Sequence, residues 1–146
     1  GSEVGGKAFV AELRKKAEGY PIEIKENPSF KELVQLYGQA KIFWNASGYG
    51  VDEEKNPEKV EHFGMTTVEA MAAGCIPVVI AKGGQREIID EAENGFFWEG
   101  KNDLINITLK IVKEEKSMKR LSKNAMLKSR HFSKEKFIER IYSLIE

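Results

Sequence analysis

The 146-residue sequence lacks several features that would assign it to a specialised class of protein. It has a single cysteine, Cys75, so no disulfide can form within the chain and a buried thiol in a reducing compartment is expected. No apolar run approaches the roughly 20 residues that cross a bilayer, and no secretory signal pattern is present. With 41% hydrophobic and 32% charged residues, the composition predicts one soluble globular domain of the cytoplasm.

The sequence also lacks the patterns of a metal site or a nucleic-acid interface. His62 and His131 stand far apart, and no His, Cys or carboxylate cluster has the spacing of metal ligands. No groove-reading motif and no alternation of aromatic and basic residues is present. The sequence therefore indicates no site for a metal or another cofactor, and we expect no nucleic-acid partner.

Charge is unevenly distributed although the formal net charge is zero. Residues 61–100 contain 2 basic and 7 acidic side chains, whereas residues 101–146 contain 12 basic and 6 acidic ones. A basic helical tail is commonly a solvated face. The functional alternative is weak attraction to a polyanion or to anionic lipid, as in a peripheral contact with the inner face of a membrane.

Periodic apolar residues predict helices that alternate with strands. Ser29 and Glu32 have the spacing of a capping box at the start of the second helix. The expected helices cover residues 7–19, 29–38, 64–74, 103–115, 117–131 and 133–145, with a short one inside 83–95. In the third of them, the face expected to pack on the sheet carries Met65, Val68, Met71 and Ala72. Ser117 and Ser133 are the candidate caps of the last two helices.

Four short segments have the composition of strands. Residues 20–26 alternate isoleucine with charge, and residues 40–47 are apolar enough for a central strand covered on both faces. The other two are expected at 75–81 and 96–100. Strands that alternate with helices form right-handed βαβ units, so the fold class is α/β with a Rossmann-like parallel sheet flanked by helices. The Gly-rich residues 1–6 precede a helix directly, which leaves open that N-terminal strands of the domain are missing.

The candidate binding chemistry lies in "EHFGMTTVE", residues 61–69. Open α/β sheets bind ligands beyond the carboxyl ends of their strands, where helix N-termini point. A helix start exposes unpaired N–H groups and partial positive charge, and Gly64 has no Cβ to obstruct a ligand. We expect the backbone amides of Gly64, Met65, Thr66 and Thr67 to bind a phosphate.

Two carboxylates flank this helix start. Glu69 lies roughly 6 to 8 Å along the helix axis from it, and a carboxylate that only accepts hydrogen bonds suits the two hydroxyls of a ribose. The alternative for Glu69 is an ordinary polar helix position. Glu61 either stabilises the helix N-terminus or accepts hydroxyls of a bound sugar and stabilises oxocarbenium-like charge, and spacing alone favours neither.

The motif "EHFGMTTVE" and the blocks that follow it, "AMAAGCIPVV", "GGQREII" and "NGFFWEG", resemble a family. They are similar to the E-x7-E region of retaining glycosyltransferases of the two-Rossmann-domain (GT-B) architecture, and of glycosyltransferase family 4 in particular. The most specific similarity spans residues 44–100. It implies that residues 1–146 are the C-terminal, nucleotide-sugar-binding domain of such an enzyme, one half of a GT-B fold without the N-terminal acceptor domain.

The resemblance also implies an activity and residue roles. The enzyme would transfer a hexose from a donor such as UDP-glucose or GDP-mannose to a saccharide or lipid-linked acceptor, with retention and without an essential metal. Glu61 would be catalytic, backbone amides from Phe63 to Thr67 would hold the sugar and diphosphate, and Glu69 would bind the ribose. Residues 25–29 would contact the base, and Gly83 and Gly84 would form a turn facing the cleft.

In that family an Arg and a Lys that grip the diphosphate come from segments before the point where this chain begins. Lys82 and Arg86 would be weak substitutes for them, so we expect this chain alone to bind nucleotide weakly and to transfer nothing. A stand-alone nucleotide or nucleotide-sugar-binding module without catalysis is the alternative function. A GT-B-like sugar epimerase is a third, against which the E-x7-E pattern argues.

Overall fold

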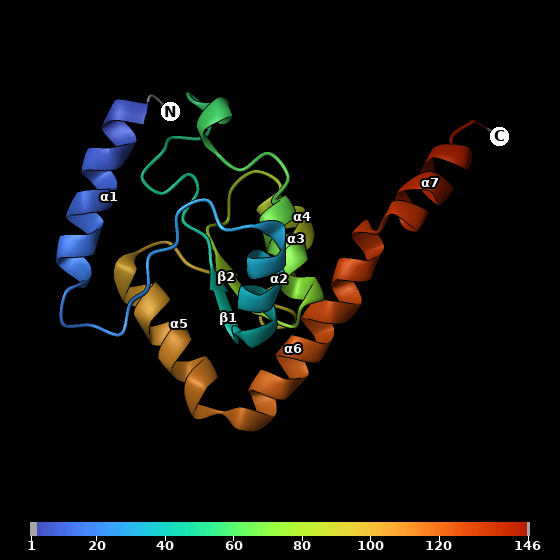
Figure 1. Cartoon of the computed structure of the whole chain (residues 1–146). Helices are drawn as coiled ribbons and strands as arrows, with labels where there is room; N and C mark the ends of the chain where they lie inside the picture. The colour runs from blue at the N-terminus through green and yellow to red at the C-terminus, as the bar shows by residue number, and fades with distance from the viewer. Residues whose placement is uncertain (1–2, 146) are drawn as a thin grey trace. The chain divides into compact units, whose positions relative to one another are not determined.

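A computed structural model describes residues 3–145 (Figure 1). The chain divides into two compact units, residues 1–33 and residues 34–146, and helix α2 (Phe30–Gln39) runs across the boundary. In the first unit, α1 (Glu3–Ala17) leads into an irregular segment, and the two are joined by an ion pair of 2.6 Å between Arg14 and Glu26.

The capping box at the start of α2 is confirmed. The Glu32 amide donates to Ser29 Oγ at 3.3 Å, and the Glu32 carboxylate accepts from the Ser29 amide at 2.8 Å. Two amides that have no partner inside the helix are thereby satisfied, which explains why α2 begins at this point.

The strand expected at residues 20–26 is wrong, because this segment is irregular. Pro21, Ile22 and Glu23 are exposed, so the alternation of isoleucine with charge does not produce a buried face. Pro21 also has no N–H to donate to a neighbouring strand.

The second unit is built on a parallel sheet of three strands in the order β1 (Ile42–Trp44), β2 (Ile76–Val79) and β3 (Phe96–Phe97). The register pairs Phe43 with Pro77 and Val78 with Phe96. The fully buried strand β2 is therefore central. Within residues 3–145, β1 lies at an edge of the sheet and Trp44 exposes 58% of its surface, so the expectation of a central, covered strand at residues 40–47 is wrong for this part of the fold.

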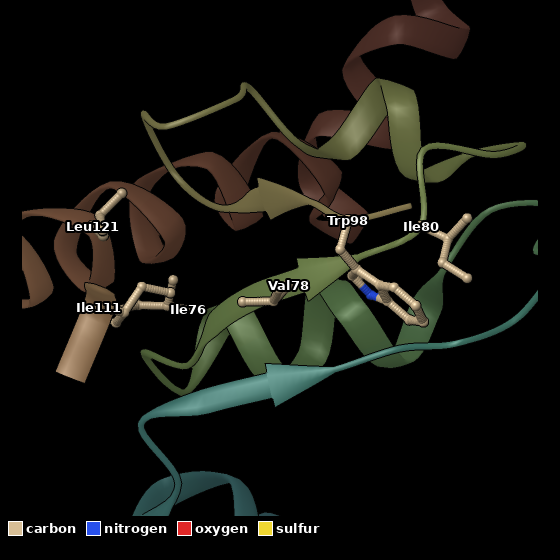
Figure 2. Packing of buried hydrophobic residues seen from close by; sticks show 6 residues of the cluster. All are labelled: Ile76, Val78, Ile80, Trp98, Ile111 and Leu121. Atoms are coloured by element: carbon tan, nitrogen blue, oxygen red, sulfur yellow. The ribbon is translucent and has the colours of Figure 1, made fainter. Parts of the chain in front are cut away.

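Side chains of β2 alternate between two apolar clusters, as the period of a strand requires. The first cluster lies between the sheet and the helices α5 (Lys101–Lys113) and α6 (Glu115–Ser129) (Figure 2). It comprises Ile76, Val78, Ile80, Trp98, Ile111 and Leu121. The second joins β2 to α3 (Met65–Ala72) and α4 (Gln85–Ile88). It comprises Met71, Val79, Ile88, Ile89 and Ala125, so α6 contributes to both clusters.

The remaining elements are short 3-10 turns, η1 (Pro57–Lys59) and η2 (Arg130–Phe132), and the last helix, α7 (Lys134–Tyr142). Ser133 caps α7, because its side chain accepts from the Lys136 amide. Ser117 is not a cap, since α6 already begins at Glu115. Within residues 3–145, no helix has both the length and the apolarity to cross a membrane.

The carboxyl ends of all three strands meet at one edge of the sheet because the strands are parallel. Residues 45–60 follow β1 at this edge, residues 80–84 follow β2, and residues 98–100 follow β3. Helix α3 also begins here, since it returns the chain to the start of β2. The predicted fold class, a parallel sheet flanked by helices, is confirmed, and this edge is where such folds bind ligands.

Candidate functional site

The first turn of α3 presents unpaired amides at the carboxyl edge of the sheet. Gly64 is its N-cap with a φ of 103°, a conformation that favours glycine. Among residues 3–145, we find no acceptor for the amides of Gly64, Met65 and Thr66. The Thr67 amide differs from the expectation of four free amides, because it donates to Gly64 O at 3.0 Å.

The buried side chain of Gln85 packs against this turn and forms a hydrogen bond with it. Gln85 exposes 1% of its surface, and its Nε2 donates to Thr67 Oγ1 at 3.0 Å. A Cβ on Gly64 would lie 3.0 Å from the same Nε2 and 3.1 Å from Ile88 Cδ1, so an added side chain would be crowded as well as strained by the positive φ. Thr67 therefore stabilises the turn through its side-chain and backbone hydrogen bonds, and its amide is not free to bind a ligand.

A turn of two glycines after β2 lies directly against the segment that enters α3. The Gly84 amide donates to Glu61 O at 3.0 Å. A Cβ on Gly84 would lie 2.5 Å from His62 O and Phe63 Cα, and a Cβ on Gly83 would lie 2.1 Å from Glu61 O. Side-chain carbons never come so close to a backbone, so residues 61–63 keep their position only beside a pair of glycines.

The two flanking carboxylates differ in burial, and neither is paired within the described chain. Glu61 is half-buried and Glu69 is exposed, and neither side chain forms a hydrogen bond or ion pair among residues 3–145. Burial raises the pKa of Tyr37, and the negative charge of Glu69 adds to this effect, which places Glu69 near the end of α2. Both carboxylates are thus available to accept hydroxyl groups.

Only part of the predicted buried face of α3 is correct. Met71 is buried and Val68 is half-buried, but Ala72 is exposed and Met65 exposes 66% of its surface. Met65 is the first residue of α3, and helical side chains tilt toward the N-terminus, so no preceding helical turn covers it. Phe63 lies beside Phe132 with ring centroids 5.6 Å apart.

Three charged residues join the loop after β1 to the glycine turn and to the residues that flank it. The Glu53 carboxylate accepts from the Gly83 amide at 2.7 Å and from both terminal nitrogens of Arg86, at 3.1 and 2.8 Å. The Lys82 ammonium donates to Gly48 O at 2.9 Å and to Val51 O. Lys82 and Arg86 are the two basic residues of the acidic segment, and both are engaged by this loop.

The remaining expectations concern metals and the base-contacting segment. Of the residues that the structure describes, no three His, Cys, Asp or Glu side chains lie close enough to hold a metal ion. Residues 25–29 belong to the first unit, whereas α3 and the glycine turn belong to the second. A contact between residues 25–29 and a base stays a prediction.

The second unit has an α/β fold, with a parallel three-stranded sheet flanked by helices, that matches the GT-B glycosyltransferase fold. A sequence profile described as "Glycosyl transferases group 1" matches residues 4–128. The chain belongs to this glycosyl transferase family. No curated protein sequence matches it.

Solved structures of glycosyltransferases have the same fold. Anabaena HepE in complex with UDP and glucose matches with a TM-score of 0.77 at 22% identity, over 97% of this chain and 37% of HepE. Sucrose-phosphate synthase from Thermosynechococcus elongatus matches with a TM-score of 0.75 at 20% identity, over 95% of this chain and 33% of the synthase. This chain therefore spans about a third of the length of these two proteins.

The C-terminal domain of LpcC, a group 1 glycosyl transferase from Francisella tularensis, matches with a TM-score of 0.60 at 21% identity. That match covers 83% of this chain and 60% of the LpcC domain. At these identities the likeness shows the fold.

Glycine at position 84 should be essential for the contact with residues 61–63. We expect Gly84→Ala to lower the free energy of unfolding by about 1 to 3 kcal/mol, because its Cβ meets backbone atoms that cannot turn away. The control is Gly38→Ala in α2, where an added Cβ meets nothing within 4 Å. The control should be neutral or slightly stabilising in urea unfolding. Equal stability of both variants would contradict the described contact.

The Glu53 ion pair should give stability a dependence on pH. Its bonds to Arg86, and then to the Gly83 amide, lower the pKa of Glu53. This stabilisation is therefore present above the pKa of Glu53 in the unfolded chain and is lost as the pH falls through its folded pKa. We expect Glu53→Gln to lower the urea midpoint at neutral pH, with the difference from the unsubstituted chain closing in acid.

The matched control for Glu53 is Glu54→Gln, which changes the adjacent exposed carboxylate. Its urea midpoint should follow that of the unsubstituted chain at every pH. A deficit of Glu53→Gln that does not change with pH would count against the ion pair.

Proposed function

We propose that this chain is the donor-binding half of a retaining glycosyltransferase of the E-x7-E type. The enzyme transfers a hexose from a nucleotide sugar to a saccharide or lipid-linked acceptor. The observation that carries the proposal is the first turn of α3, where three unpaired amides, at residues 64–66, are flanked in the sequence by the unpaired carboxylates of Glu61 and Glu69. Membership of the family and the UDP-glucose bound to HepE support a nucleotide sugar as the ligand.

The backbone amides and the carboxylates of the site bind different parts of the nucleotide-sugar donor. The amides of Gly64, Met65 and Thr66, with the partial positive charge of the helix start, bind the diphosphate. The carboxylate of Glu69 accepts the two ribose hydroxyls. Glu61 accepts hydroxyls of the hexose and stabilises the oxocarbenium-like charge that develops when the glycosidic bond to phosphate breaks.

The diphosphate carries more charge than three amides neutralise. Lys82 and Arg86 are engaged by residues 48–53, so they contribute little to a leaving diphosphate. We therefore place the missing basic groups in a preceding segment of a longer enzyme, and most of the acceptor site in its N-terminal domain. The match to this chain covers only 37% of HepE, which supports a longer enzyme. The longer enzyme acts in the cytoplasm, at the inner face of the membrane when its acceptor is lipid-linked, and without metal or cofactor.

A nucleotide-sugar-binding module without catalysis is the second candidate. The engagement of both basic residues favours it, because a module that only binds does not need to stabilise a leaving diphosphate. Turnover of a nucleotide sugar by the full-length protein would exclude it. The isolated chain should show no turnover under either proposal.

The ribose role of Glu69 predicts the effect of a single substitution. In a titration of the ¹⁵N-labelled chain with UDP, GDP or ADP, we expect the amide signals of residues 64–66 to shift. Glu69→Ala should weaken the tightest of these complexes about tenfold or more, because two bonds to a charged acceptor are lost. Glu93→Ala, which removes an exposed carboxylate in the turn before β3, is the control and should not change the affinity. Unchanged binding by Glu69→Ala would show that the ribose lies elsewhere.

A further inference from the structure

A separate pocket of about 270 Å³ opens at the same edge of the sheet. Two of its walls follow the carboxyl ends of β2 and β3, and the third comes from the loop after β1. The residues that form it include Tyr49, Gly50, Ile80, Lys82, Trp98 and Glu99. The pocket adjoins the proposed donor site, because Lys82 precedes Gly83, whose backbone lies against Glu61.

Two packed aromatic rings, those of Tyr49 and Trp98, line part of this pocket. Trp98 exposes only 4% of its surface, and its indole N–H donates to Asn45 O at 3.2 Å. Figure 2 shows the indole beside Ile80 at the end of β2. The Tyr49 ring lies 5.3 Å from the Trp98 ring at an angle of 31°, and Tyr49 exposes 47% of its surface. The half-exposed Tyr49 ring, which packs on the buried Trp98 ring, therefore gives the pocket an aromatic surface that a ligand can contact.

The polar groups of the pocket consist of one cation and one anion. Two of the three N–H donors of Lys82 are used by Gly48 O and Val51 O, which leaves one donor. Glu99 is exposed and forms no ion pair or hydrogen bond with the rest of the described chain. The charges cancel, so the pocket favours neither a phosphate nor an organic cation.

We propose that this pocket binds one neutral pyranose ring of the acceptor saccharide. A pyranose has an apolar C–H face that packs on an aromatic ring and hydroxyls that donate to Glu99 and accept from Lys82. A volume of about 270 Å³ lies just below the roughly 300–1,000 Å³ of sites for drug-sized ligands, which suits a single sugar ring better than a nucleotide. The inference rests on the proposed function, since it gives that enzyme an acceptor contact within this half.

The test is a titration of the ¹⁵N-labelled chain with methyl glycosides of glucose, mannose and galactose, and separately with UDP. We expect at least one glycoside to shift the amide signals of Gly50, Ala81 and Glu99, with a dissociation constant in the millimolar range. Tyr49→Ala should weaken this binding about tenfold, and Glu99→Gln about fivefold, because a neutral acceptor replaces a charged one. Glu99→Gln leaves the ring pair intact, and Tyr20→Ala, a change to an exposed tyrosine of the first unit, is the control.

The possible outcomes test the sugar-binding pocket and the proposed donor site independently. The inference would be overturned if no glycoside shifted the pocket signals, or if the glycosides shifted only the signals of residues 64–66. Glycoside binding in the pocket without UDP binding would support the inference and contradict the proposed donor site. UDP binding at residues 64–66 with an unresponsive pocket would contradict the inference alone.

Discussion

The contact between the backbones of the glycine turn and of residues 61–63 is the constraint on which the rest of the site depends. It places Glu61 beside the first turn of α3, because Gly83 and Gly84 allow two backbone segments to approach without side chains between them. Two further contacts stabilise this arrangement. Gln85 forms a hydrogen bond with Thr67 in the α3 turn, and the Glu53 carboxylate, from the loop after β1, accepts from the Gly83 amide. The unpaired amides of residues 64–66 are thus fixed before any ligand binds, so little ordering entropy is lost on binding.

The acidic character of residues 61–100 is consistent with a nucleotide-sugar site once its charges are assigned to different parts of the ligand. Backbone amides suit a diphosphate, and unpaired carboxylates suit neutral hydroxyls. The two basic side chains of this segment are bound by loop carbonyls and by Glu53, so in the proposed function they contribute little to neutralising a diphosphate. The balanced charges of Lys82 and Glu99 extend the same preference for hydroxyl groups to the pocket beside Trp98.

Local patterns predicted most of the helices and the strands of the sheet, but the burial and neighbours of these elements depend on contacts between residues distant in sequence. The capping box of Ser29 and Glu32 and the Gly64 start of α3 follow from neighbours within a few residues, and both are present in the structure. The edge position of β1 depends on which strands pair, which no local pattern encodes. The ion pair between Glu53 and Arg86 joins residues 33 apart, so the sequence offered no periodic signal for it. The repeated glycines at 83 and 84 indicated a turn, but the closeness of residues 61–63 is visible only in the fold.

The central claim is that the first turn of α3 binds the diphosphate of a nucleotide through backbone amides. A crystal structure of the chain soaked with UDP tests it most directly. The account predicts phosphate oxygens about 3 Å from the amide nitrogens of residues 64–66, with the ribose hydroxyls on the Glu69 carboxylate. Phosphates bound instead to Lys82 and Arg86, with the Glu53 loop displaced from them, would contradict it.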